Sequence, residues 1–206
     1  MFENREQAGT LLALRLKKII AKDFIVVSLL RGGIILGKKI SDYFNIPLKS
    51  LAVKKIGAPL NPELGIGAVT FDKTYYFNNY IMQELNISAA YKEAVLESKY
   101  REAKLLQKKI EKNTKIISYK EKNVLIVDDG VAIGNTVICS SLYLRKQKAK
   151  GIILAIPVIS KDIVNNIKKY FDKVIYLKIV NDLASVSQFY KYFPQITDEK
   201  VLNCLV

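Results

Sequence analysis

The chain has 206 residues, 50% of them hydrophobic, which is enough for one domain with a sizeable core. Its 33 Lys and Arg exceed its 19 Asp and Glu, and the formal net charge of +14 favours anionic partners, although a lysine-rich solvated surface explains the charge equally well. Histidine is absent and the two cysteines have no metal-ligand spacing, which excludes Ser-His-Asp triads, Cys-His pairs and histidine metal sites.

Strand and helix patterns alternate along the first half of the chain. Apolar periodicity predicts helices over residues 11–20 and 34–44, and compact apolar runs predict strands over residues 24–30 and 48–56. A loop rich in Gly and Pro begins at residue 57, and aromatic residues among the polar turn residues that follow it predict a small hairpin or flap. A long charged helix follows from a predicted N-cap at Ser88 to residue 112.

The second half repeats this alternation. Strands are predicted over residues 124–129, 151–159 and 173–179, separated by helices over residues 135–148 and 161–170. The tail predicts a short helix capped by Thr197. Short apolar strands separated by helices indicate βαβ units, so we expect an α/β fold with a central parallel sheet and a single domain over residues 1–206.

The ends and the charge distribution also limit location and partners. The N-terminal segment is amphipathic and lacks the apolar core of a signal peptide. No stretch approaches the ~18 apolar residues of a membrane span, so we expect a cytoplasmic protein with no membrane partner. The basic residues are spread along the chain, and no run of them is typical of a nucleic-acid arm.

The most informative stretch is VLIVDDGVAIGNT, residues 124–136. Four apolar residues run into Asp128 and Asp129, at the carboxyl end of a strand, where open α/β sheets bind ligands and where buried carboxylates need partners. Gly130 and Gly134 let consecutive amides point inward at the start of the next helix, beside the Thr136 hydroxyl. The pattern indicates a sugar-phosphate site, in which the carboxylates accept from ribose hydroxyls and the loop holds the 5-phosphate.

Other phosphate and metal motifs fit this stretch less well. A Walker P-loop requires Gly-Lys-Ser/Thr and a dinucleotide turn requires GxGxxG, and both are missing. Paired aspartates also form acidic metal or phosphoacceptor pockets, as in receiver domains, but such pockets do not explain the glycine loop. An Asp-Gly turn that merely ends the strand is the structural alternative.

The same stretch resembles the motif that binds 5-phosphoribosyl 1-pyrophosphate (PRPP) in type I phosphoribosyltransferases. Further segments resemble a stand-alone group of predicted phosphoribosyltransferases, namely LLRGGIILGKKISDYFNIPL, LAVKKIGAPLNPELGIGAV, IILAIPVIS and VSQFYKYFPQITDEKVLNCL. The likeness covers nearly the whole chain and is weakest over residues 70–122. It implies a three-layer α/β/α fold with a central parallel sheet, a mobile loop and flap near residues 57–87, and a hood formed by residues 181–206.

The resemblance also implies roles for individual residues. Asp128 and Asp129 would be the catalytic carboxylates that hold the ribose 2- and 3-hydroxyls and contact Mg²⁺ indirectly, through those hydroxyls and water. The loop around the 5-phosphate would comprise Gly130, Val131, Ala132, Ile133, Gly134, Asn135 and Thr136. Pyrophosphate would be bound by Arg31, Gly32, Gly33, Lys54 and Lys55. For this last group, an ordinary strand-to-helix turn and a solvated strand end are the alternatives.

The activity that the resemblance implies is phosphoribosyl transfer. Such a pentosyltransferase uses PRPP and Mg²⁺ to transfer a 5-phosphoribosyl group to a nitrogenous, nucleobase-like acceptor with release of pyrophosphate. Ile133 departs from the family, whose motifs usually have threonine there, and the missing hydrogen bond to the 5-phosphate is worth ~1.5–3 kcal/mol. The alternative is therefore a catalytically weak PRPP- or nucleotide-sensing regulator that binds nucleic acid, although no helix-turn-helix or basic stripe is recognisable. A homodimer is the default assembly, and the sequence does not identify the acceptor.

Overall fold

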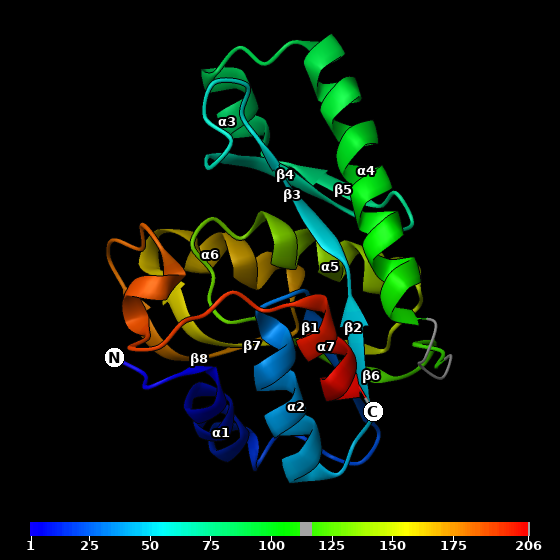
Figure 1. The fold of residues 1–206 in the computed structure, drawn as a ribbon, viewed down its shortest axis with the longest axis vertical. Helices are drawn as coiled ribbons and strands as arrows, with labels where there is room; N and C mark the ends of the chain where they lie inside the picture. The colour runs from blue at the N-terminus through cyan, green and yellow to red at the C-terminus, as the bar shows by residue number, and fades with distance from the viewer. Residues whose placement is uncertain (112–116, 206) are drawn as a thin grey trace.

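Five parallel strands form the central sheet of the computed structural model, which describes residues 1–111 and 117–205 (Figure 1). The strands are β1 (Phe24–Leu29), β2 (Leu48–Leu51), β6 (Asn123–Val127), β7 (Gly151–Ser160) and β8 (Lys173–Val180). They lie side by side in the order β2-β1-β6-β7-β8. Every residue of β1 and all but the first of β6 and β7 are buried, as expected of parallel strands covered on both faces. The predicted α/β fold is confirmed.

Helices cover both faces of this sheet (Figure 1). On one face lie α1 (Arg5–Leu16) and α2 (Gly33–Phe44), and on the other lie α5 (Asn135–Lys146) and α6 (Val164–Ile167). Successive β6 side chains alternate between the two cores: Val124 and Ile126 pack with α5, whereas Leu125 and Val127 pack with α1 and α2. The three-layer arrangement agrees with the prediction, and the alternation bears on the aspartates that follow β6.

A small antiparallel sheet stands beside this core (Figure 1). It consists of β3 (Val53–Gly57), β4 (Gly65–Thr70) and β5 (Tyr75–Phe77), accompanied by α3 (Asn79–Glu84) and α4 (Ala89–Glu111). The predicted hairpin of aromatic residues is present. Two of its rings pack against the core, since Phe71 lies 5.4 Å from Tyr143 and Tyr76 lies 5.9 Å from Tyr170, centre to centre, whereas Tyr75 and Tyr80 are exposed. The mobility of this segment stays a prediction, and the predicted helix end at residue 112 lies outside the described residues.

The predicted strand over residues 48–56 is in fact two strands in two different sheets. The chain leaves the parallel sheet at Ala52, whose backbone N–H donates to Oε1 of Gln107 in α4 at 2.7 Å. The Gln107 amide nitrogen donates in turn to the Ser50 carbonyl at 3.4 Å. A side chain from a distant helix takes the place of a strand partner here, and an alternating apolar pattern cannot reveal such a break.

Helix ends depart from the prediction where local capping decides them. The first helix does not span residues 11–20: it begins at Arg5, because the Asn4 side chain caps it by accepting a backbone N–H. The predicted capping roles of Ser88 and Thr197 are confirmed, since each hydroxyl accepts the N–H three residues ahead at 3.2 Å. The helix predicted over residues 161–170 is broken, and only α6 is α-helical, between two 3-10 turns.

The N-terminal residues meet residues 189–191 beside the sheet. The Phe2 N–H donates to the Phe189 carbonyl at 2.7 Å, and the Lys191 N–H donates back to the Phe2 carbonyl at 2.8 Å. These bonds place the start of α1 next to the segment that leads to α7 (Asp198–Leu205). Within residues 1–111 and 117–205, no helix combines the length and apolarity that crossing a bilayer requires.

Candidate functional site

The aspartate pair directly follows β6, at the edge of the sheet where its strands end. Oδ1 of Asp128 accepts the backbone N–H of Asp129 at 2.9 Å. Oδ2 of Asp129 accepts from Nε of Arg5 at 2.9 Å, and Arg5 begins α1, in the layer that Val127 also faces. The alternation of strand side chains therefore continues past the end of β6, and the two carboxylates point to different sides.

Burial raises the pKa of both carboxyl groups above its usual range. The increase is large for Asp128, because the charge of Asp129 adds to burial. For Asp129 the Arg5 guanidinium acts in the opposite direction and favours the ionised form. One carboxylate thus has a built-in cation, whereas the other has no ion-pair partner among the described residues. Hydroxyl groups of a ligand would supply the missing hydrogen bonds.

Arg5 also reaches the C-terminal part of the chain. Its Nη1 donates to the Pro194 carbonyl at 2.8 Å, and its guanidinium carbon lies 3.5 Å from the centre of the Phe193 ring. The Tyr190 hydroxyl donates to the backbone carbonyl of Asp129 at 2.7 Å. Arg5 matched no sequence pattern, because it lies far from the C-terminal residues in the chain and shares no motif with them. Tyr190, Phe193 and Pro194 fall within the predicted hood of residues 181–206, which assigned no individual roles.

Residues 130–136, which we call the donor loop, run from the aspartate pair into α5. The Val131 N–H donates to the Val158 carbonyl at 2.9 Å, and the Ser160 N–H donates to the Val131 carbonyl at 3.1 Å, so β7 holds the loop in place. Gly134 has φ +91°, a conformation that favours glycine, and leads directly into α5. Backbone N–H groups at such a helix start bind anions well.

A cavity of about 540 Å³ lies over the donor loop, and this volume suits a small-molecule ligand. All the donor-loop residues line it, together with Lys55, Glu63, Gly65 and residues 183–186. Asn135 joins the loop to the small sheet, because its Nδ2 donates to the Gly65 carbonyl at 2.8 Å. The structure thus gathers the predicted 5-phosphate residues and Lys55 around one cavity.

A second cavity, of about 430 Å³, lies against Arg5 and Gly32, the residues that approach the Asp129 carboxylate. Arg31, Lys54 and residues 193–196 also line it. The peptide bond between Leu30 and Arg31 is cis. The predicted pyrophosphate residues are therefore divided: three line this cavity, Lys55 lines the other, and Gly33 lines neither.

Two glycines let the loop after β1 approach the end of β6. A side chain at Gly32 would overlap the carboxylate of Asp129. A side chain at Gly33 would meet the Val127 carbonyl. Both positions therefore require glycine for close approach, whether or not pyrophosphate binds there.

The cations of the second cavity have carboxylate partners from other elements. Nε of Arg31 lies 2.8 Å from Oδ1 of Asp198 in α7, and Nζ of Lys54 lies 3.5 Å from Glu102 in α4. Asp198 also accepts from Lys109 at 2.7 Å, and this hydrogen bond holds the pKa of Asp198 below its usual range. An anionic ligand would compete with these carboxylates for the same cations.

No group of three or more Cys, Asp or Glu side chains gathers into a metal site in the part of the chain that the structure describes. Mg²⁺ commonly keeps several waters and uses one or two carboxylates together with substrate phosphates. The donor set of Asp128 and Asp129 fits a Mg²⁺ ion that arrives with a diphosphate.

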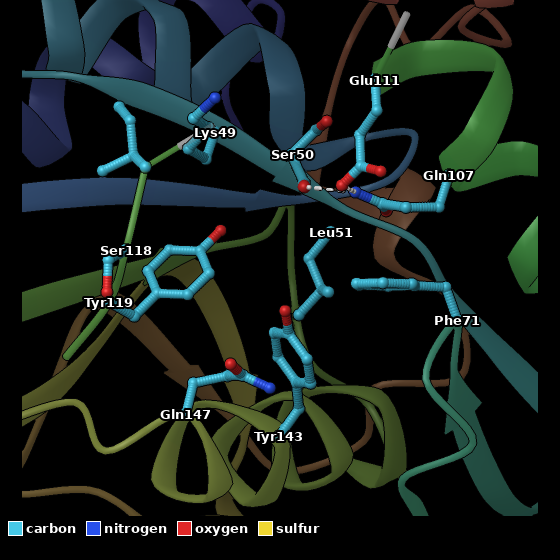
Figure 2. Close-up of a pocket in the computed structure, with 11 residues that line it drawn as sticks. Lys49, Ser50, Leu51, Phe71, Gln107, Glu111, Ser118, Tyr119, Tyr143 and Gln147 are labelled. Atoms are coloured by element: carbon cyan, nitrogen blue, oxygen red, sulfur yellow. Dashed lines mark hydrogen bonds between the residues drawn. The ribbon is translucent and has the colours of Figure 1, made fainter. Parts of the chain in front are cut away.

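A third cavity, of about 470 Å³, lies apart from this site (Figure 2). Lys49, Gln107, Tyr119 and Tyr143 are among its walls, and the Gln107 side chain bonds to Ser50 there. Its lining residues line neither of the cavities beside the aspartates. It is therefore not part of the candidate site.

The sequence matches the family model described as the phosphoribosyl transferase domain over residues 6–192. A Mycobacterium tuberculosis protein, whose name provisionally assigns it to the phosphoribosyl transferases, is 30% identical over 205 residues. This alignment covers 100% of the chain and 46% of the relative, so the chain spans about half the length of that protein.

Solved structures share the fold. The TT1426 protein of Thermus thermophilus superimposes with a TM-score of 0.82 at 27% identity, over 99% of this chain and 97% of that one. The AQ2163 protein of Aquifex aeolicus gives 0.54 at 13% identity, over 85% and 74%. The family match, the relative and the three-layer fold agree with the resemblance of the aspartate motif, and the chain belongs to the phosphoribosyl transferase domain family.

Proposed function

We propose that this chain is a phosphoribosyltransferase that uses PRPP and Mg²⁺ to transfer a 5-phosphoribosyl group to a nitrogenous, nucleobase-like acceptor, with release of pyrophosphate. The aspartate pair itself lines neither cavity. The supporting observation is that the donor loop, which directly follows the pair, lines one cavity, and that Arg5, which bonds Asp129, lines the other together with Arg31 and Lys54. PRPP carries phosphate at both ends of its ribose, so the donor loop suits the 5-phosphate and the cationic cavity suits the pyrophosphate. The family match supports the same chemistry.

In this scheme the side chains bind and orient the donor and form no covalent intermediate with it. Asp128 and Asp129 accept hydrogen bonds from ribose hydroxyls, while Arg31 and Lys54 bind the leaving pyrophosphate. As the bond from C1 to pyrophosphate breaks, positive charge develops on the ribose ring and the nearby carboxylates stabilise it. The acceptor nitrogen then forms its bond to C1 and gives up its proton to solvent or to the departing pyrophosphate. Mg²⁺, when bound, would neutralise pyrophosphate oxygens and help that group to leave.

Titration calorimetry of PRPP with and without Mg²⁺ tests the proposal, with ribose 5-phosphate as the control ligand. We expect Mg²⁺-dependent binding of PRPP that is at least about tenfold tighter than that of ribose 5-phosphate. Asp128→Asn should weaken PRPP binding by about tenfold or more, because a charge-assisted hydrogen bond is lost. No binding of either ligand would refute the proposal, and equal binding of both would contradict the pyrophosphate site.

The second candidate is a PRPP- or nucleotide-sensing regulator, which Ile133 favours because it puts an apolar side chain in the donor-loop cavity. Filter binding with mixed RNA and DNA across a salt series distinguishes the two functions, since a nucleic-acid-binding regulator should show steep salt dependence. A cytoplasmic location and a homodimer remain parts of the first proposal, which fractionation and light scattering would test.

A further inference from the structure

Arg5 is a buried cation with contacts in three directions, and its role is not explained by the donor motif. The residue is 6% exposed. Nε donates to Asp129, Nη1 donates to the Pro194 carbonyl, and the guanidinium lies over the Phe193 ring. Through these contacts the Arg5 side chain connects Asp129, at the end of β6, to residues 193 and 194 in the C-terminal segment.

A second link runs parallel to the first. The Tyr190 hydroxyl donates to the Asp129 carbonyl, and the Tyr190 ring lies 4.9 Å from that of Phe193, centre to centre. Residues 190–196 are therefore connected to the aspartate pair through two side chains, Arg5 and Tyr190. Because hydrogen-bonded side chains in a buried network polarise and orient one another, a change at Asp129 reaches the Phe193 ring through Arg5.

The same segment forms a wall of the cationic cavity. Arg5, Phe193 and Pro194 line it together with Arg31 and Gly32, which follow β1. A ligand that hydrogen-bonds Asp129 shares the carboxylate with Nε of Arg5, which orients it, and any shift of Arg5 alters the wall at Phe193 and Pro194. Arg5 thus contacts both the carboxylate that would bind the donor and the wall of the cavity.

We propose that Arg5 is a positioning residue that couples donor binding at Asp129 to the geometry of residues 190–196, the segment that forms a wall of the cationic cavity. The inference rests on the proposed function, because the donor is PRPP. Arg5 itself contacts neither acceptor nor reacting atoms in this scheme: it acts through Asp129 and Phe193.

The chain contains no tryptophan, so Phe193→Trp provides a single fluorescent reporter that keeps an aromatic face beneath the guanidinium. Titration of this variant with PRPP and Mg²⁺ should change its tryptophan emission, and the half-maximal change should occur at the PRPP concentration that matches the Kd from calorimetry.

The test variant adds Arg5→Lys to this reporter. It should abolish most of the emission change and weaken PRPP binding threefold or more, because an ammonium cannot donate to Asp129 and Pro194 in the same fork geometry. Arg15→Lys, on the exposed side of the same helix, is the control and should preserve both values. Equal responses in the Arg5 and Arg15 variants would overturn the proposal.

A ligand-free measurement separates failure of the coupling from failure of the proposed function. In the reporter background, Asp129→Asn should shift the emission maximum without any ligand, whereas Asp128→Asn should leave it unchanged, because only Asp129 contacts Arg5. An unshifted emission in the Asp129 variant would overturn the coupling even if PRPP binds. Lack of PRPP binding with a shifted emission would instead refute the proposed function alone.

A variant at the segment itself guards against misfolding of the Arg5 and Asp129 variants. Phe193→Leu removes the ring beneath Arg5, in the wall of the cationic cavity, and should weaken PRPP binding about threefold. Tyr43→Leu removes a comparable ring beneath Lys17, at 5.6 Å, and should leave PRPP binding unchanged. Identical affinities of these two variants would also contradict the coupling.

Discussion

The two sides of the aspartate pair are built in different ways. The donor loop is one uninterrupted run of sequence, held by backbone hydrogen bonds to β7, and it presents N–H groups and glycine. The opposite side is assembled from distant parts of the chain, and its groups are ion pairs: Arg5 with Asp129, and Arg31 with Asp198. The first side is preorganised by the backbone, whereas the second depends on side-chain charges that a ligand must share.

This difference predicts different responses to substitution. Removing Arg5 leaves the mostly buried Asp129 carboxylate without its cation, which is costly. Changing the donor loop alters a ligand contact or a backbone angle, with a smaller cost to the fold. Substitutions on the two sides therefore test this contrast.

Arg5→Gln should be the most destabilising of these changes. It leaves the Asp129 carboxylate buried without its cation, and such a loss costs about 3–5 kcal/mol. For a chain of this size each kcal/mol corresponds to roughly 2–4 °C in Tm, so a thermal melt should show a clear decrease. Urea unfolding gives the free energy directly.

The control for this prediction is Arg15→Gln, on the exposed side of α1, which should change stability by less than about 0.5 kcal/mol. The double variant Arg5→Gln/Asp129→Asn should recover part of the loss, because it removes both charges. A thermal melt of Arg5→Gln that matches the unsubstituted chain would show that Asp129 does not need its cation.

The same contrast explains what the sequence could predict. The donor-loop side was recognisable because its aspartates, glycines and threonine are contiguous, and their order has a physical meaning. Arg5 was missed, and Tyr190 and Phe193 were predicted only as part of the hood, because the packing of Phe2 against residues 189–191 is what brings them to Asp129. The central sheet was predicted from its apolar runs, but the division of one strand at Ala52 depends on Gln107, 55 residues away. Local patterns therefore predicted elements and motifs, while contacts between distant residues decided where this strand divides and which residues meet at Asp129.

Ile133→Thr should improve the donor-loop side. The threonine hydroxyl restores a hydrogen bond to the 5-phosphate worth ~1.5–3 kcal/mol, which corresponds to at least about tenfold tighter PRPP binding. Calorimetry measures this change, and Ile133→Val is the control because it keeps the side chain apolar and adds no donor. Equal affinity of the two variants would mean that position 133 does not face the phosphate.

Gly134→Ala should disturb the donor loop through its backbone. Gly134 has φ +91°, and an L-residue in that region costs about 1–2 kcal/mol. The new Cβ would also press on the Ile167 side chain of α6. We expect lower stability by urea unfolding together with weaker PRPP binding. Unchanged stability would show that the loop can adopt another conformation at this residue.

Asp128→Asn should have the smallest effect on the fold and the opposite sign from Arg5→Gln. Burial and the Asp129 charge raise the pKa of Asp128 above its ordinary value of 3.8. The native state therefore holds this proton more tightly than the unfolded chain, and stability falls as pH rises from about 4 through the native pKa. The asparagine variant has no carboxyl group to ionise at this position. Near neutral pH its free energy of unfolding should therefore exceed that of the unsubstituted chain by about 1 kcal/mol.

Urea unfolding at pH 4 and pH 7 checks this prediction for Asp128. The variant and the unsubstituted chain should be nearly equal at pH 4, where the carboxyl group is mostly protonated in the native state and about half protonated in the unfolded chain, and should differ at pH 7. Asp129 remains in both proteins, so its own titration largely cancels in the comparison. A variant that is less stable at pH 7 would mean that Asp128 already has a stabilising partner. A more stable variant that no longer binds PRPP would show that the carboxylate is retained for the ligand at a cost to the fold.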